Sequence, residues 1–184
     1  MQEDVPNPRR KVYIEPSIFE RIRQGEQEAF RELYDITYKP LYAFLLSYTL
    51  NQEDAQDLLQ DTYIQVYRNC HLYQEQGNPM AWMMKIAKNL FLMKCRKAKP
   101  EEDNFEDMEG RMGFEDMSHV ENRIVLEKMF EHLSTEDRNL IIMHDIGGLK
   151  HREIAKLLDM PLGTVMARYH RGIRKLQKEF GEKL

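Results

Sequence analysis

The sequence has only two cysteines, which argues against a disulfide-stabilised fold and against a zinc site built on cysteine pairs. Cys70 and Cys95 are isolated, and neither belongs to a Cys-x-x-Cys or Cys/His spacing. The six histidines show no metal-ligand or triad spacing, and the sequence contains no glycine-rich phosphate loop. We therefore expect no metal, no cofactor and no enzymatic activity, and two unpaired thiols are typical of a reducing cytoplasm.

Long apolar runs are also absent. No segment approaches the roughly 20 apolar residues that a membrane-spanning helix needs. The first eight residues are acidic and interrupted by prolines, unlike a secretory signal. Alternating β-branched runs, which would predict a sheet, are missing as well. The sequence predicts an all-α protein that does not insert into a membrane.

The net charge is small, −4, but the charged residues lie in blocks of one sign. Residues 85–99 contain six Lys and Arg and no acidic residue, whereas residues 101–118 contain eight Asp and Glu and one Arg. Residues 138–184 contain ten basic and five acidic residues. Such blocks indicate surfaces that meet different partners, although solvated helix faces would produce the same pattern.

Helical periodicity divides the chain into two parts. Apolar residues recur at three-four spacing in three segments before residue 98, and again from Leu126 onward. Between them lies an acidic segment with Pro100, two glycines and few residues able to form a core, which is typical of a flexible linker. We expect a disordered tail at residues 1–15, helical domains at 16–98 and 120–184, and an acidic linker at 99–119.

The second part carries the pattern of a helix-turn-helix. Residues 151–176 form two amphipathic segments around a turn at Asp159–Pro161, and the second segment has a basic face. A helix of this kind fits the major groove, with its first turns at base edges and flanking cations at phosphates. Basic helix pairs also occur in proteins that do not bind DNA. We expect base-edge contacts from Thr164, Ala167, Arg168 and Arg171, and phosphate contacts from Arg152, Arg174 and Lys175.

Asp57, Gln60 and Asp61 form an acidic ridge, a polar stripe at three-four spacing on a helix whose opposite face is apolar. This ridge suits a basic partner helix. Acidic residues at Glu53 and Asp54 are also explained by the helix dipole, because they lie in the first turn. Asp61 lies in the middle of the helix, where the dipole gives no such explanation.

The helix that follows Pro79 is basic, in contrast to the acidic helix before it. Trp82, Lys85 and Asn89 lie on one side of it, with Lys88 beside them. A cation, an amide and an indole on one stripe can bind a strand backbone, hydrogen-bond a base edge and stack on a displaced base. We expect these four residues to contact nucleic acid. For Trp82, packing in the core is the alternative.

Three motifs make the chain similar to a known family. They read DAQDLLQDTY at 54–63, MAWMMKIAKNL at 80–90 and PLGTVMARYHR at 161–171. In this order they resemble the extracytoplasmic-function (ECF) sigma factors, promoter-recognition subunits of bacterial RNA polymerase, and the resemblance covers residues 18–176. It implies that a region 2 domain binds core polymerase and melts the minus-ten element. A region 4 domain would read the minus-thirty-five element and dock on the flap of the second-largest subunit.

The resemblance also implies roles for the predicted sites. The acidic ridge would contact the clamp helices of the largest subunit, and Lys85 and Asn89 would contact the melted non-template strand. Residues 69–78 would capture a flipped base. The acidic linker would thread through the polymerase, and an anti-sigma factor would hold the cytoplasmic protein inactive, in some cases at the membrane.

Several positions depart from the family pattern. Met166 replaces the usual Lys or Arg, which removes one expected DNA contact, and Ala167 replaces a common Ser. Arg168 and Arg171 remain, so these changes concern the promoter sequence more than the function. Two alternatives stay open: a helix-turn-helix regulator independent of polymerase, which leaves the acidic ridge unexplained, and a sigma-like decoy, which has no need of DNA-facing cations.

Overall fold

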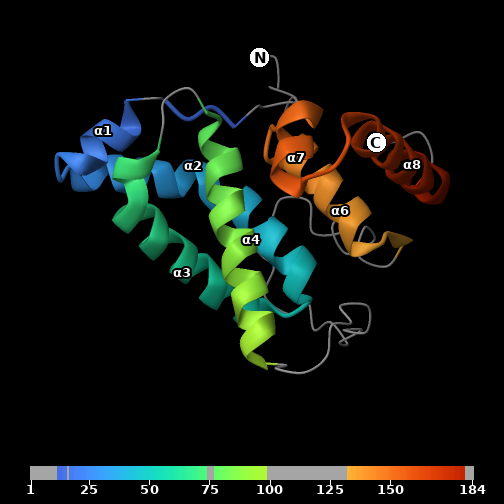
Figure 1. Cartoon of the computed structure of the whole chain (residues 1–184), viewed down its shortest axis with the longest axis horizontal. Helices are drawn as coiled ribbons and strands as arrows, with labels where there is room; N and C mark the ends of the chain where they lie inside the picture. The colour runs from blue at the N-terminus through green and yellow to red at the C-terminus, as the bar shows by residue number, and fades with distance from the viewer. Residues whose placement is uncertain (1–11, 16, 74–76, 99–131, 181–184) are drawn as a thin grey trace, which may run out of the picture.

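The structure is a computed structural model that describes residues 12–15, 17–73, 77–98 and 132–180. Every regular element within these ranges is a helix (Figure 1). This confirms the prediction of an all-α protein. The predicted linker at 99–119 and residues 1–11 of the predicted tail lie outside the described residues.

The first helical group is built around three long helices. Helices α2, α3 and α4 pack against one another, while α1 and the 3-10 turn η1 pack together at one end. The elements of this group are α1 (Ile18–Arg23), α2 (Gln27–Thr49), α3 (Gln52–Asn69), η1 (Cys70–Leu72) and α4 (Pro79–Ala98).

The second helical group contains the predicted helix-turn-helix. Helices α7 and α8 follow each other across the turn at residues 159–161, and α8 packs on α6. A Cβ added at Gly172 would lie 3.0 Å from Ile141 Cδ1, which shows how closely α8 approaches α6. The elements are α6 (Thr135–Ile141), the π-helical turn η2 (Ile142–Ile146), α7 (His151–Leu158) and α8 (Leu162–Phe180).

Local capping explains where several of these helices begin and end. The side chain of Asn51 accepts the Asp54 N–H at 3.0 Å at the start of α3, and Ser134 accepts the Asp137 N–H at 3.3 Å at the start of α6. Asp159 ends α7 in the left-handed conformation, with φ of 54°. Aspartate adopts this conformation more readily than most side chains, so it can stand at this C-cap in place of glycine.

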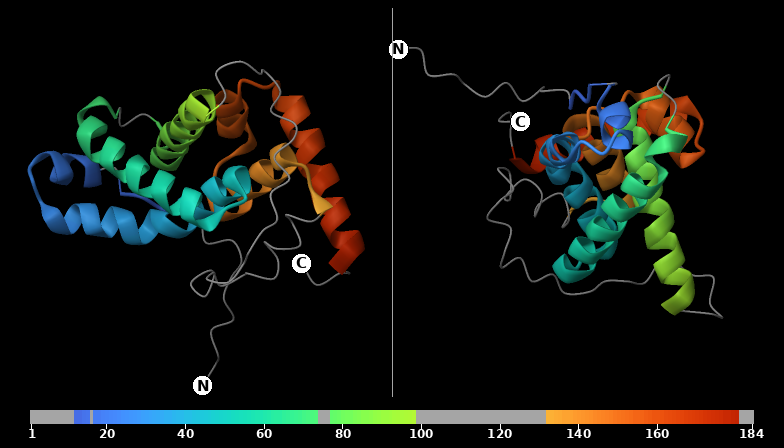
Figure 2. Two further views of the ribbon diagram at one scale, coloured as in Figure 1. Left: turned by 90° about the horizontal axis from the view of Figure 1, so that it is seen from below. Right: turned by 90° about the vertical axis from the view of Figure 1, so that its left-hand side faces the viewer.

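The two helical groups pack against each other, and their buried apolar residues form one continuous core. Helix α2 contacts α6 and η2, and α4 contacts α7 (Figures 1 and 2). At the first contact the Ser47 hydroxyl contacts Asn139 Oδ1, and Arg138 Nη2 donates to the Ser47 carbonyl at 3.3 Å. At the second, Asn78 Nδ2 donates to Glu153 Oε2 at 3.0 Å. Buried polar groups at the first contact and half-buried ones at the second therefore join the two helical groups.

In the described ranges, no helix has the length and apolarity that crossing a membrane would require.

Candidate protein- and nucleic-acid-binding surfaces

The acidic ridge lies on the exposed side of α3. Asp57, Gln60 and Asp61 are all exposed, while the opposite side of the helix is buried against α2 and α4. Among the described residues, no cation forms an ion pair with Asp57 or Asp61. Asp54 differs, because its carboxylate accepts a hydrogen bond of 2.5 Å from the Lys94 ammonium of α4 and forms an ion pair with it. The ridge thus presents negative charge that the described part of the protein does not neutralise.

Beyond the ridge, α3 continues into an apolar surface that the sequence pattern did not predict. Ile64 and Tyr67 are exposed on this surface. With Phe30, Tyr63 and Arg68 they line a hollow of about 240 Å³. The surface available to a partner helix on α3 is therefore acidic at one end and aromatic at the other.

Helix α4 brings two of its four predicted nucleic-acid residues to an exposed stripe. Lys85 and Asn89 are both exposed and lie four residues apart. Trp82 is half-buried, and its ring packs at 5.5 Å against the rings of Phe19 and Tyr73. The indole therefore takes part in the packing of α1 on α4, and its contact with a base stays a prediction.

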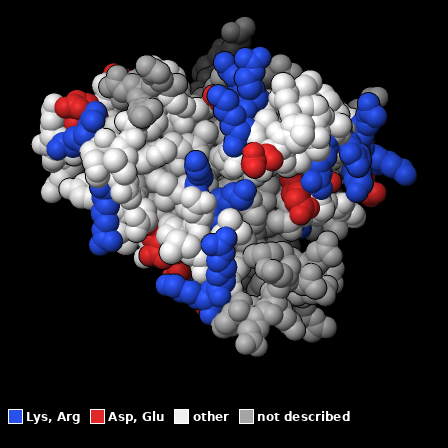
Figure 3. All heavy atoms as spheres, viewed as in Figure 1, with Lys and Arg blue, Asp and Glu red and all other residues white. Residues whose placement is uncertain are grey.

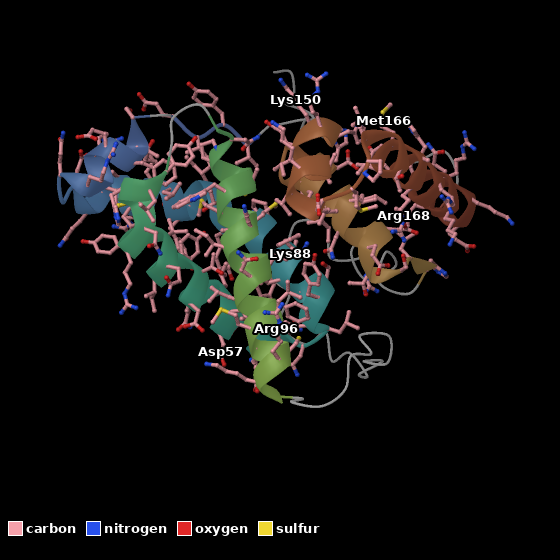
Figure 4. All side chains as sticks on the ribbon, viewed as in Figure 1. Asp57, Lys88, Arg96, Lys150, Met166 and Arg168 are labelled. Atoms are coloured by element: carbon pink, nitrogen blue, oxygen red, sulfur yellow. The ribbon has the colours of Figure 1, made fainter. Side chains whose placement is uncertain are left out.

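Lys88 faces the second helical group instead of the exposed stripe (Figure 4). Burial lowers the pKa of its ammonium, and the negative charge of Asp159, at the end of α7, partly offsets this effect. One predicted DNA-binding cation is thus half-buried on α4, with the negative charge of α7 nearby.

Lys and Arg side chains gather over α4 and beside α7 on the face shown in Figure 3. This distribution agrees with the basic blocks read from the sequence. On α8, five of the predicted residues are exposed on the side opposite the buried Val165, Gly172 and Leu176, and Arg152 is exposed at the start of α7. The exposed residues of α8 are Thr164, Ala167, Arg171, Arg174 and Lys175.

Arg168 is held differently from the other predicted base-reading residues. Its Nε donates to Asp137 Oδ1 at 3.0 Å, and its Nη2 lies 3.6 Å from Glu136 Oε2. The side chain is 29% exposed and Asp137 is 12% exposed, so the pair lies at the edge of the contact between α8 and α6. The described structure gives Arg168 a role in joining α8 to α6, and its base contact stays a prediction.

An aromatic cluster joins η2, α7 and α8. The rings of His144 and His151 stack with centroids 4.2 Å apart, and the Tyr169 ring lies 4.8 Å from each. The Tyr169 hydroxyl donates to Asp145 at 3.0 Å. Burial, followed by the neighbouring imidazoles, lowers the pKa of His151. Histidine spacing gave no sign of this cluster, because its members come together only in the folded chain. The described residues contain no group of three His, Cys, Asp or Glu side chains that could hold a metal ion.

Comparison with known proteins identifies two regions of one family. The sequence matches the family models of sigma-70 region 2 over residues 33–101 and of sigma-70 region 4 over residues 123–176. It is 27% identical over 173 residues to the ECF RNA polymerase sigma factor SigW of Bacillus subtilis, covering 86% of this chain and 92% of that protein. It is 31% identical over 169 residues to ECF sigma factor SigE of Mycolicibacterium smegmatis, covering 88% of this chain and 61% of that protein.

Two solved structures have a fold similar to that of this chain. The sigma factor RpoE from Bartonella quintana, solved in complex with the anti-sigma factor NepR, superposes with a TM-score of 0.65 at 22% identity, over 84% of this chain and 98% of that chain. CnrH, solved in complex with the cytosolic domain of CnrY, superposes with a TM-score of 0.62 at 18% identity, over 92% of this chain and 98% of that chain.

Proposed function

The chain belongs to the sigma-70 family as a sigma factor of the ECF group, and on this premise we propose how its two helical groups divide promoter recognition. A sigma factor is a transcription initiation factor, so the chain is a promoter-recognising protein and not an enzyme. We assign residues 16–98 to a domain that binds core polymerase and melts the minus-ten element. Residues 120–184 form the domain that reads the minus-thirty-five element, and residues 99–119 link the two.

The observation that carries this assignment is the pair of oppositely charged surfaces on neighbouring helices of the first group. The acidic ridge of α3 has no cation paired with Asp57 or Asp61 among the described residues, and α4 exposes Lys85 and Asn89. A basic helix can bind the ridge while a displaced strand binds α4. One domain can thus hold the polymerase, at the clamp helices of its largest subunit, and the opened DNA at the same time.

The exposed basic residues of α8 and α7 support the role of the second domain. Arg171 lies on the exposed side of α8, where a major groove can reach it, and Arg152, Arg174 and Lys175 flank that side. Phosphate contacts from the flanking cations would position the helix, and the residues on its outer face would read bases. Docking on the polymerase flap belongs to the same proposal.

An anti-sigma factor is the further partner that we propose. Of the two structures with a similar fold, RpoE was solved with the anti-sigma factor NepR and CnrH with the cytosolic domain of CnrY. The chain has exposed apolar residues beside the acidic ridge, to which such a partner could bind. We also propose that the chain acts in the cytoplasm, because core polymerase and promoter DNA are found there.

The decisive experiment is reversal of charge on the acidic ridge. We expect Asp61→Lys to abolish binding to purified core polymerase and run-off transcription, because it places a cation opposite the basic partner helix. Asp61 is exposed on α3, so the circular dichroism spectrum should stay native. Glu28→Lys, the same charge change at an exposed site on α2, is the matched control and should bind normally.

Undiminished polymerase affinity of the Asp61→Lys variant would refute the assignment of the ridge. Failure of the unmodified chain to join core polymerase at low salt would refute the division of function as a whole, and would favour a regulator that acts without polymerase. A sigma-like decoy would sequester a regulatory partner without supporting transcription.

A further inference from the structure

Two apolar side chains are exposed on the first two turns of α8. Leu162 is 39% exposed and Met166 is 41% exposed. The other exposed large apolar side chains of the described residues all belong to residues 13–93. A single exposed apolar residue needs no explanation, but these two lie four residues apart and therefore on the same side of one helix.

Two cationic residues at the start of α7 border this apolar pair. With the first residues of α7, the pair lines a hollow of about 500 Å³, and Lys150 and Arg152 are exposed at its edge. The acidic member, Glu153, is already engaged, because its Oε2 accepts the Lys150 N–H at 2.7 Å and the Asn78 amide at 3.0 Å. The hollow thus combines an apolar floor with a positive edge.

Met166 and Arg168 point in different directions from α8. In Figure 4, Met166 lies at the same end of the α7–α8 pair as Lys150 and extends away from the ribbon, whereas Arg168 lies on the side of α6. Met166 is also next to the exposed Ala167 and five residues before the exposed Arg171. What places Met166 near base edges is its exposure within the first two turns of α8, because the N-terminal residues of such a helix meet base edges when the helix enters a major groove.

The chemistry of methionine limits what it can read there. Its thioether has no donor and is only a weak acceptor, so it cannot replace the bidentate contact of a basic side chain with guanine. In the major groove, the apolar group that distinguishes one base from the others is the C5-methyl of thymine. A flexible, polarisable side chain packs well against such a group, and the cations at the edge of the hollow suit the flanking phosphates.

We propose that Met166, packed beside Leu162, reads a thymine methyl in the half-site bound by α8. This inference rests on the proposed role of the second domain, and it adds the identity of one base. Double-stranded promoter DNA is the occupant favoured over a protein partner, because Lys150 and Arg152 border the apolar pair and the nearby carboxylate is already hydrogen-bonded.

The test removes one methyl group at a time. Holoenzyme reconstituted with the full chain first selects duplexes from a randomised library, and each thymine of the upstream half-site is then replaced singly by deoxyuridine. We expect one replacement to weaken binding by about fourfold, the effect of one buried methyl-sized group. In Met166→Gln, which keeps side-chain length and helix propensity, that replacement should have no effect. Met93→Gln, at an exposed methionine of α4, is the matched control and should retain the fourfold effect.

Each other outcome overturns the inference. If no thymine is sensitive, or if the sensitivity persists in Met166→Gln, then Met166 does not read a methyl group, although selection of specific duplexes would still support the proposed function. If Met166→Gln leaves every duplex affinity unchanged, Met166 does not contribute to DNA binding and the inference fails. If holoenzyme selects no duplex, the proposed function fails together with the inference.

Discussion

At the scale of single residues, two arginines of α8 that look equivalent in the sequence have different surroundings. Arg171 is exposed and has no ion pair with any described residue, whereas Arg168 is bonded to Asp137 and lies near Glu136. Both belong to the basic side of one amphipathic helix. They differ because Arg168 lies next to α6 and Arg171 does not. The sequence pattern of α8 does not show where α6 packs.

Alanine substitution should separate their roles. We expect Arg171→Ala to weaken binding to a minus-thirty-five duplex by about 1–3 kcal/mol, as for loss of a good base contact, without changing the free energy of unfolding. Arg168→Ala should lower the free energy of unfolding by about 1–3 kcal/mol, because it leaves the largely buried Asp137 carboxylate without its donor. Urea denaturation and duplex titration measure the two quantities. Equal losses of stability in both variants would contradict the distinction.

At the scale of elements, the contact of η2 with α7 and α8 contains a stack of two imidazoles. His144 Nδ1 lies 2.7 Å from the Leu149 carbonyl, so this nitrogen carries the proton and donates it. Burial, His144 and His170 all lower the pKa of His151, and Asp145 opposes them. The stack is therefore most stable when His151 is neutral.

The pH dependence of stability follows from that direction. A histidine whose pKa is lower in the folded state than its unfolded value of about 6.5 takes up protons preferentially in the unfolded state below that pH. Its stabilising contribution is complete above pH ~6.5 and is lost as the pH falls. We expect the urea midpoint to decrease between about pH 7 and pH 5, and His151→Gln to reduce this decrease.

The control for this prediction is His71→Gln, which changes an exposed histidine of η1 outside the cluster. It should leave the pH dependence of the urea midpoint as in the unmodified chain. A slope in His151→Gln that equals that of the control would assign the acid sensitivity to other groups.

At the scale of the whole molecule, a small residue lets the two helical groups approach closely. Ser47 of α2 is fully buried against α6, and its hydroxyl donates to the Phe44 carbonyl at 2.7 Å as well as contacting Asn139. Burial lowers the pKa of the adjacent Arg138 to about 10, which leaves the guanidinium charged at neutral pH. A larger side chain at position 47 would have no space.

We expect Ser47→Leu to force the groups apart, at a loss of about 1–3 kcal/mol in the free energy of unfolding, because it overpacks the contact. The radius of gyration from small-angle X-ray scattering should increase while the helical circular dichroism signal persists. Separation should also return Lys88 to solvent, since Asp159 of α7 would no longer lie beside it. Ser47→Ala, which removes only the hydroxyl, should keep the dimensions of the unmodified chain, and an unchanged radius in Ser47→Leu would contradict the prediction.

The sequence by itself determined the helical class, the helix-turn-helix and the exposure of Asp57, Gln60 and Asp61. These features depend on a period of 3.6 residues and on caps such as Asn51 and Ser134, which act within one or two turns of the chain. The family motifs lie within the same short segments. Local physics is enough to place such residues on the outer face of a helix.

Only the tertiary structure decided what the remaining side chains contact. Arg168 meets Asp137 across 31 positions of the sequence, and Ser47 meets Asn139 across 92. Trp82 joins an aromatic cluster with Phe19 from another helix. Each of these contacts arises where two helices pack, and the packing of helices depends on how whole faces fit together. The period of a single helix shows which side is polar, but the choice between a DNA-facing cation and an internal ion pair is made by the neighbouring helix.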